Sequence, residues 1–141
     1  MIYRGLNKLI EQRDENGNAI KFEYDSEGQL TTITNENNQQ HTFVYDACGR
    51  LSSDTGFDGT QTQYQYDPSG KITQVRRPDG STLKLGYDRI GRIVTITGHA
   101  VDGTTHQNRY QYDNAGRLIE ASNEHSLVTF EYDALGRIIK E

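Results

Sequence analysis

The sequence predicts an all-β protein: an antiparallel β-hairpin repeat meander of about 14 strands, in which hairpin follows hairpin along the chain and the sheet curls or spirals. A tyrosine-centred repeat occurs seven times, with steps of 21, 21, 21, 21, 25 and 20 residues between tyrosines. Most repeats also carry two turn signals, and the segments before the tyrosines alternate apolar and polar residues. A fixed period in this range indicates that each repeat packs only on its neighbours.

Six clear repeats share the pattern Tyr-Asp-x-x-Gly, then a polar residue and Leu or Ile, and a worn copy begins at Tyr3. We therefore expect residues 1–141 to be a single array with repeats starting near Tyr3, Tyr24, Tyr45, Tyr66, Tyr87, Tyr112 and Tyr132. The repeated positions are predicted to be structural, and they are Tyr24, Asp25, Gly28, Tyr45, Asp46, Gly49, Arg50, Tyr66, Asp67, Gly70, Tyr87, Asp88, Gly91, Arg92, Tyr112, Asp113, Gly116, Arg117, Tyr132, Asp133, Gly136 and Arg137.

The first turn of each clear repeat places Asp at turn position one and Gly at position four, as Asp46 and Gly49 illustrate. This is the preference of a type I turn, and the Asp side chain can accept hydrogen bonds from backbone donors ahead of it. Gly supplies the positive φ of a G1 bulge, so a three-residue hairpin loop is predicted at each of these places.

The second turn lies half a repeat away. Its signals are Asn16-Gly17, Asp58-Gly59 and Asp79-Gly80, with Asn37-Asn38 at the same place in its repeat. Asn-Gly and Asp-Gly favour two-residue hairpins of type I′, in which both central residues have positive φ. In the longest repeat we expect residues 97–106 to form a longer loop around Asp102-Gly103, and Glu124-His125 is a weak turn.

The strands that lead into the first turns alternate cleanly and put two large side chains on one face. These pairs are Phe22/Tyr24, Phe43/Tyr45, Tyr64/Tyr66, Leu85/Tyr87, Tyr110/Tyr112 and Phe130/Tyr132. Tyr24 is expected opposite Leu30 on the same face. In the outgoing strands Leu30 and Ile33 stand three apart, so either one points to the other face or a bulge intervenes. We expect large burial of Tyr45, Tyr66, Tyr87 and Tyr112 with Leu51, Ile72, Ile93 and Leu118.

Composition favours a thin layer over a deep core. Only 33% of the residues are hydrophobic even with nine Tyr counted. The net charge of −5 disfavours a nucleic-acid partner, because such a protein carries a basic stripe. No apolar run is long enough for a membrane span, and no signal peptide is evident. The single cysteine, Cys48, leaves the compartment undecided.

No residue pattern predicts chemistry. The aspartates are expected to cap turns, and Cys48 is incidental in an exposed turn. His41, His99, His106 and His125 are expected to be solvated loop histidines. The basic residues after the glycines are expected to cover neighbouring rings with their stems and to pair with the aspartates. These residues are Arg50, Lys71, Arg92, Arg117 and Arg137, and Gln29 interrupts the series.

The repeated Tyr-Asp-x-x-Gly-Arg-Leu unit and turns such as Pro78-Asp79-Gly80 resemble the YD repeats of the Rhs family. That family includes bacterial polymorphic toxins, the shell-forming component of insecticidal toxin complexes and the animal teneurins. The resemblance covers essentially the whole chain and implies a ribbon of strands that spirals into a hollow shell around a toxic C-terminal segment. Family shells have many more than seven repeats, and the family's terminating self-cleavage segment is absent here.

These observations predict a structural segment of an Rhs/YD-repeat shell that encapsulates or displays a C-terminal toxin domain, without enzyme activity or cofactor. The alternative is a carbohydrate- or cell-surface-binding repeat module, because exposed tyrosine rows can stack on sugars. The expected partners are the rest of a longer shell and its toxin cargo, and self-association through the sheet edges is expected. The resemblance implies an exported or cell-surface parent protein, although the localisation of this chain is not determined by its residues.

Overall fold

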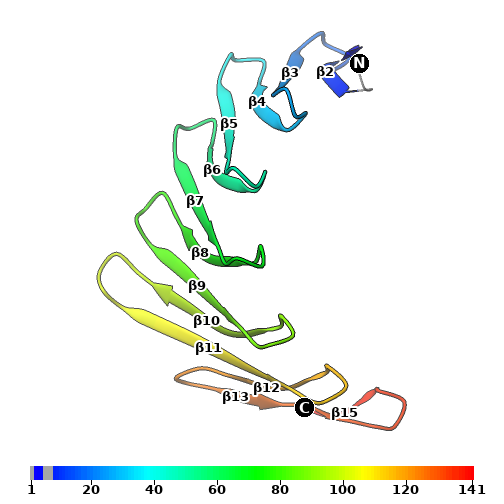
Figure 1. The fold of residues 1–141 in the computed structure, drawn as a ribbon, viewed down its shortest axis with the longest axis vertical. Coiled ribbons are helices and arrows are strands. Elements are labelled where there is room, and N and C mark those ends of the chain that lie inside the picture. The colour runs from blue at the N-terminus through cyan, green and yellow to red at the C-terminus, as the bar shows by residue number, and fades with distance from the viewer. Residues whose placement is uncertain (1, 5–7) are drawn as a thin grey trace. The chain divides into compact units, whose positions relative to one another are not determined.

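The computed structural model describes residues 2–4 and 8–141, and these contain strands and turns but no helix (Figure 1). The fold class predicted from the sequence is confirmed. The strands are β1 (Ile2–Arg4), β2 (Lys8–Arg13), β3 (Ala19–Tyr24), β4 (Leu30–Thr34), β5 (Gln40–Tyr45), β6 (Leu51–Thr55), β7 (Gln61–Tyr66), β8 (Ile72–Arg76), β9 (Thr82–Tyr87), β10 (Ile93–His99), β11 (Thr105–Tyr112), β12 (Leu118–Ser122), β13 (Leu127–Thr129), β14 (Glu131–Tyr132) and β15 (Ile138–Lys140).

The chain divides into two compact units, Met1–Tyr64 and Gln65–Glu141. Within each unit the strands are hydrogen-bonded in the order of the chain, and neighbouring strands are antiparallel. In the second unit this order runs as far as β13, and β14 and β15 then pair with each other. The predicted meander is therefore confirmed.

The described residues contain fifteen strands where the sequence predicted about 14, because the last incoming strand is interrupted at Phe130. β13 ends at Thr129 and β14 begins at Glu131. The backbone N–H of Phe130 still donates to the carbonyl of Ile119 at 2.9 Å, and this hydrogen bond keeps the segment attached to β12 despite the interruption.

Both classes of turn have the same backbone hydrogen bonds, except the turn at Glu124-His125, where the N–H of Asn123 donates to the carbonyl of Ser126. In the first class the N–H of Gly49 donates to Asp46 O at 2.9 Å, and Gly49 has a φ of 76°. In the second class Gly17 bonds Asp14 O in the same way, and Asn16 does not have positive φ. The predicted type I′ turns at Asn16-Gly17, Asp58-Gly59 and Asp79-Gly80 are therefore wrong. A type I turn with one left-handed residue forms instead; that residue is the glycine in these three turns and Asn38, with a φ of 59°, at the same place in its repeat.

The longest repeat contains longer strands, and the predicted loop over residues 97–106 is wrong. β10 continues to His99 and β11 begins at Thr105, with Thr97 paired to Gln107 and Gly98 paired to His106. The turn between them has the same hydrogen bonds as the shorter repeats, from Gly103 N to Ala100 O and from Ala100 N to Thr104 O. The extra residues therefore extend the ladder of backbone hydrogen bonds.

A β-bulge follows the first turns that begin at Asp25, Asp46, Asp88, Asp113 and Asp133, and it settles the choice left open for the outgoing strands. Tyr24 lies opposite Leu30, whereas Glu23 lies opposite Thr32, so one extra residue is inserted. Leu30 and Ile33 consequently share the face of Tyr24. The extra residue is Thr31 or Ser52 in two of these repeats, and its hydroxyl donates to the carbonyl of Glu23 or Val44 at 3.2 or 3.0 Å. Thr73, at the same place in its repeat, donates likewise to Gln65 at 3.3 Å.

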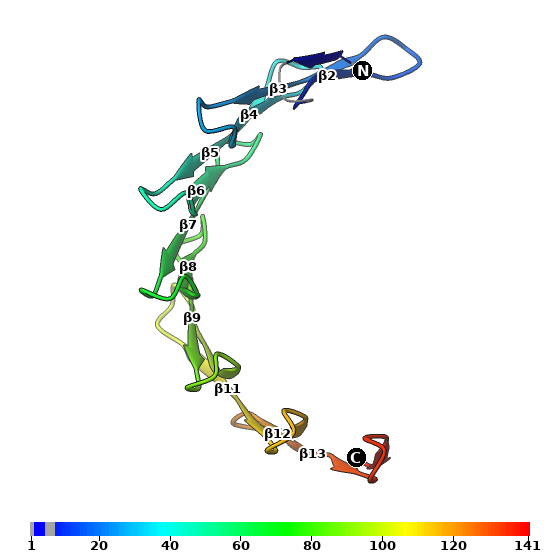
Figure 2. The same ribbon diagram turned by 45° about the vertical axis from the view of Figure 1, so that its right-hand side comes forward.

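Each unit is one layer thick (Figure 2), and none of the described residues is fully buried. Tyr45, Tyr87 and Tyr112 are half-buried. The prediction of large burial is therefore wrong. Neighbouring repeats cover these rings in part, but no second layer of strands or helices covers the face of the sheet on which they lie. Contacts between adjacent repeats take the place of a central core.

Candidate functional site

In five repeats the hydroxyl of the first-turn tyrosine connects the repeat to the one before it. It donates a hydrogen bond to the carbonyl of an apolar residue in the preceding repeat. Leu30, Ile93 and Leu118 are three of these acceptors, and each lies beside a bulge where the backbone ladder is interrupted. The bonds run from Tyr24 to Leu9 at 2.9 Å, Tyr45 to Leu30 at 2.8 Å, Tyr87 to Ile72 at 2.7 Å, Tyr112 to Ile93 at 2.8 Å and Tyr132 to Leu118 at 2.6 Å. A phenylalanine could not make this bond.

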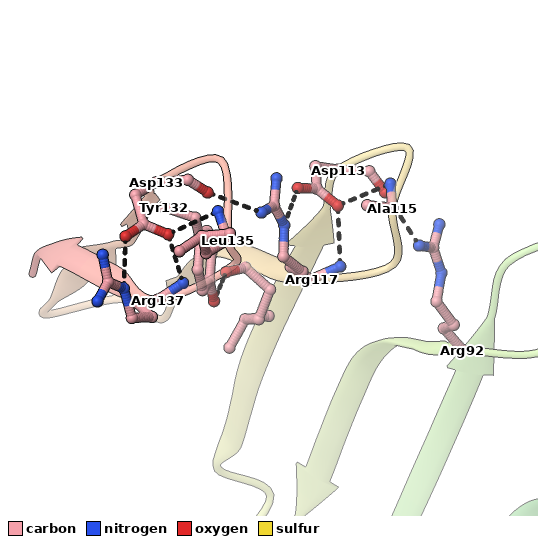
Figure 3. A network of polar contacts seen from close by, with 9 residues as sticks. Arg92, Asp113, Ala115, Arg117, Tyr132, Asp133, Leu135 and Arg137 are labelled. Carbon is pink, nitrogen blue, oxygen red and sulfur yellow. Dashed lines mark hydrogen bonds and ion pairs between the residues drawn. The ribbon is translucent and has the colours of Figure 1, made fainter.

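The aspartate beside each tyrosine closes its own turn. In Asp113 the Oδ1 atom accepts from the backbone N–H groups of Ala115 and Arg117, both at 2.9 Å (Figure 3). The bond to the residue four places on recurs in all six clear repeats. Backbone donation from Arg117 holds the pKa of Asp113 below its ordinary value, against the opposing effect of desolvation. The backbone N–H and the side chain of Arg50 likewise lower the pKa of Asp46, and those of Arg137 lower the pKa of Asp133. The predicted turn-capping role is confirmed.

The arginine after the glycine joins two successive repeats. Arg92 Nε donates to Asp88 Oδ2 at 2.7 Å in its own repeat, and its guanidinium lies 4.6 Å from the ring centroid of Tyr112 in the next. Its second nitrogen donates to the Asp113 carbonyl at 3.3 Å. Arg117 repeats this arrangement, with its guanidinium 4.8 Å from the Tyr132 ring (Figure 3). The predicted covering of rings and pairing with aspartates is confirmed for these arginines.

In repeats without an arginine at this position, a lysine or glutamine side chain contacts the next repeat instead. Lys8 lies over Tyr24 and Lys71 over Tyr87, with the ammonium groups 5.1 and 5.8 Å from the ring centroids. Gln29 donates to the Gly49 carbonyl of the next repeat at 2.7 Å. The contact between repeats is therefore retained even where the uncharged Gln29 replaces a basic residue. We call this row of aspartates, basic residues and tyrosines the YD ladder.

One polar cluster departs from the repeat pattern, and the sequence did not predict it. His41 Nε2 lies 3.0 Å from Asp54 Oδ1, and the Tyr64 hydroxyl donates to Asp54 Oδ2 at 2.9 Å. The His41 ring stacks on Phe43, with centroids 4.5 Å apart, and meets Phe57 edge-on at 5.6 Å. His41 is therefore half-buried in β5 and is not a loop histidine.

The signal for this cluster was present in the repeat register. Asp54 stands where the other repeats have Ile33, Val75, Ile96 and Ala121, so an acid occupies a position that is otherwise apolar. A buried or half-buried carboxylate needs partners, which His41 and Tyr64 supply. Of the other histidines, His99 and His106 lie on strands, and only His125 lies in a turn as expected.

The described residues contain no group of three metal-ligating His, Cys, Asp or Glu side chains. Cys48 is a free, exposed thiol in a turn, as its position predicted. Within residues 2–4 and 8–141 there is no helix with the length and apolarity needed to cross a membrane. The YD ladder is thus the feature with the most specific geometry.

A single-layer meander with hairpins linked by a YD ladder defines a YD-repeat sheet. Residues 14–141 match the Teneurin YD-shell family, and the chain belongs to that family. No curated protein matches the sequence of this chain.

Solved structures of Tc toxin proteins share the fold. TcdB2-TccC3-TEV superposes with a TM-score of 0.81, TcdB2-TccC3 with 0.78, and the Photorhabdus luminescens Tc holotoxin pore carrying a TccC3 mutation with 0.77. Each is 20% identical and covers 89% of this chain, which spans only 7% of that chain. At this identity the similarity shows the fold alone.

Proposed function

We propose that this chain is a wall segment of a YD-repeat shell that encapsulates or displays a C-terminal toxin domain and has no chemistry of its own. In this proposal residues 1–141 are one continuous array within a longer polypeptide. The observation that carries it is the YD ladder, in which Arg92 and Tyr112 bind successive repeats to each other. Such bonds make a sheet that can be extended repeat by repeat.

The much greater length of the related Tc toxin chains supports a shell that is longer than this segment. The chain matches only 7% of the length of the Tc toxin chains, so a complete wall of that kind needs many more repeats. The chain belongs to the Teneurin YD-shell family, and its sheet is one layer thick in each unit, as expected for the wall of a shell. The proposed partners are accordingly the remaining repeats and the enclosed domain.

A carbohydrate- or surface-binding module is supported less well. Stacking on a sugar needs an accessible aromatic face, and here a basic side chain lies over the rings of Tyr24, Tyr87, Tyr112 and Tyr132. The hydroxyls of these tyrosines are also engaged with backbone carbonyls. Binding of the chain to a glycan array would restore this alternative.

The test is limited proteolysis of the full-length polypeptide that contains the array. The segment after the repeats should resist trypsin at least tenfold longer than the same segment expressed alone. Combining Arg92→Ala with Tyr112→Phe should shorten this protection, because two repeats then lose their connection. Arg89→Ala with Tyr110→Phe is the matched control and should leave it unchanged. Equal cleavage of enclosed and free segments, or a reading frame that stops at Glu141, would overturn encapsulation by this chain.

A further inference from the structure

The turns of the second class differ in the side chain that closes them. In the turns of residues 14–18 and 35–39, a side-chain oxygen of the first residue accepts the N–H groups of the third and fifth residues. In the turns of residues 56–60, 77–81 and 100–104, the first residue is Gly, Arg or Ala, and the aspartate at the third position accepts from the fifth residue instead. Hydrogen bonds therefore hold the side chain at the third position only in the last three of these turns.

Asn16 and Asn37 occupy the third position of the first two turns. Both residues are exposed, and among the described residues neither side-chain amide makes a hydrogen bond. At the corresponding place, Asp58 Oδ1 accepts from the N–H and the hydroxyl of Thr60 at 3.0 and 2.7 Å. The amides of Asn16 and Asn37 can therefore rotate, whereas the Asp58 carboxylate is held.

The residue that follows distinguishes the two asparagines. Gly17 has a φ of 86°, and the space in which a side chain would stand is open. Its N–H donates to the Asp14 carbonyl at 3.2 Å, against 2.9–3.1 Å for the corresponding bond of the other described turns. Asn37 is followed by Asn38, whose own Cβ crowds the backbone nitrogen. The nitrogen after Asn16 is therefore the more accessible of the two.

We propose that Asn16 is a site of spontaneous deamidation, through a succinimide formed with the backbone nitrogen of Gly17. The Gly17 nitrogen attacks the side-chain carbonyl carbon of Asn16, and the bond from that carbon to the amide nitrogen breaks. The amide nitrogen takes up the proton lost by Gly17 and leaves as ammonia. Water then opens the succinimide at one of its two carbonyls and gives either aspartate or isoaspartate at position 16. Both products add one negative charge to the exposed turn.

The aspartates that precede a glycine at the same place are poor substrates for this reaction. Donation from the hydroxyl and the backbone N–H of Thr60 lowers the pKa of Asp58, and Thr104 lowers the pKa of Asp102 in the same way. These carboxyl groups are therefore ionised at neutral pH, and an ionised carboxylate has no leaving group for the attacking nitrogen to displace. The reaction is expected at Asn16 over a period in which Asp58 and Asp102 do not change.

The two products differ in their effect on the turn. An aspartate at position 16 has the same side chain as Asp58 in its turn, so the backbone keeps its form. Isoaspartate instead adds one backbone carbon between positions 16 and 17. The bonds from Asp14 N to Asn18 O at 3.1 Å and from Gly17 N to Asp14 O at 3.2 Å span this segment, so isoaspartate should loosen the β2–β3 hairpin. The inference does not depend on whether a shell encloses a cargo.

The test is incubation of the 141-residue chain in mildly alkaline buffer, followed by trypsin digestion and mass spectrometry. Asn16 lies in the tryptic peptide of residues 14–21, and Asn37 lies in that of residues 22–50. The first peptide should gain the mass of an amide replaced by a carboxylate, and fragmentation should place the change at Asn16. Asn37 should react at least about tenfold more slowly. The native rate at Asn16 should lie within about tenfold of that in a synthetic peptide of residues 11–21, because an exposed turn opens at little cost in free energy.

Exchanges between the turns test the role of the glycine. Asn38→Gly should make Asn37 react as fast as Asn16. Gly17→Asn should slow the reaction at Asn16 about tenfold, and Asn38, with a φ of 59°, shows that this place in the turn accepts asparagine. Gly59→Asn is the matched control and should leave the rate at Asn16 unchanged. Circular dichroism checks that the variants keep the sheet.

Anion exchange separates the more acidic products from the starting chain. The isoaspartate fraction should unfold at a lower urea concentration than the variant Asn16→Asp, and equal midpoints would contradict the loosening of the hairpin. Three results would overturn the proposal itself: a rate at Asn16 more than about tenfold below that of the synthetic peptide, equal rates at Asn16 and Asn37, or an unchanged rate in Gly17→Asn.

Discussion

Replacing Tyr112 by Phe removes one hydrogen bond of the YD ladder and leaves the ring in place. The bond to the Ile93 carbonyl is 2.8 Å long and half-buried, which is close to the preferred length for a hydroxyl donor. Its loss should lower the free energy of unfolding by about 1 kcal/mol, within a range of roughly 0.5–1.5. No cavity term is expected, because the substitution removes only the hydroxyl from a single-layer sheet.

The assay is urea denaturation followed by circular dichroism. With a slope of about 2 kcal/mol per molar, the midpoint should fall by about 0.5 M. Tyr110→Phe is the control, since Tyr110 lies two residues earlier on the same face of β11 and its hydroxyl has no hydrogen-bond partner among the described residues. If both variants shift the midpoint equally, the hydroxyl bond between repeats contributes nothing specific and the reasoning is refuted.

Three further perturbations test other parts of the structure. Gly91→Val should cost more than about 1 kcal/mol in the same denaturation assay, because Gly91 has a φ of +89°. Gly98→Val, at a strand position without positive φ, should cost less, and the opposite order would contradict the turn assignment. The turn aspartates have lowered pKa values in the folded state, so their stabilisation is complete above the unfolded value of about 4 and is lost as pH falls through the folded values. The urea midpoint should therefore hold from pH 7 to 5 and drop by pH 3, and an unchanged midpoint at pH 3 would refute this link. Asp54→Ala should cost about 1–2 kcal/mol by removing the carboxylate that pairs with His41 and accepts from Tyr64, whereas the double change His41→Ile with Asp54→Val should recover at least half of that loss.

The period and the first turns could be predicted from the sequence because their causes are local. Asp46 and Gly49 act within five residues, through a side-chain acceptor and a positive φ that glycine tolerates. The second turns were misassigned because each dipeptide, such as Asn16-Gly17, was read without its flanking residues. The N–H of Asp14 donates to the Asn18 carbonyl and the N–H of Gly17 to the Asp14 carbonyl, and the turns at Asp58-Gly59 and Asp79-Gly80 have the same backbone bonds. The turn is defined by five residues rather than by two.

The contacts between repeats could be predicted only in part. The Arg92 stem was expected over a neighbouring ring, since a long basic side chain beside an aromatic row has few alternatives. The acceptor of the Tyr112 hydroxyl is 19 residues away in sequence, and its availability depends on a bulge whose position was not determined. The His41–Asp54 pair likewise required the register between β5 and β6, which brings His41 and Asp54 onto one face.

The lengthened strands β10 and β11 have a consequence for how such a protein can change. Their four additional residues extend the sheet on the side away from the YD ladder, and the bond from Tyr112 to Ile93 is retained at 2.8 Å. One rim of the sheet is thus held to a constant geometry, while the other accepts hairpins of different length. Insertions and new sequences can accumulate on that second rim without loss of the contacts that join the repeats.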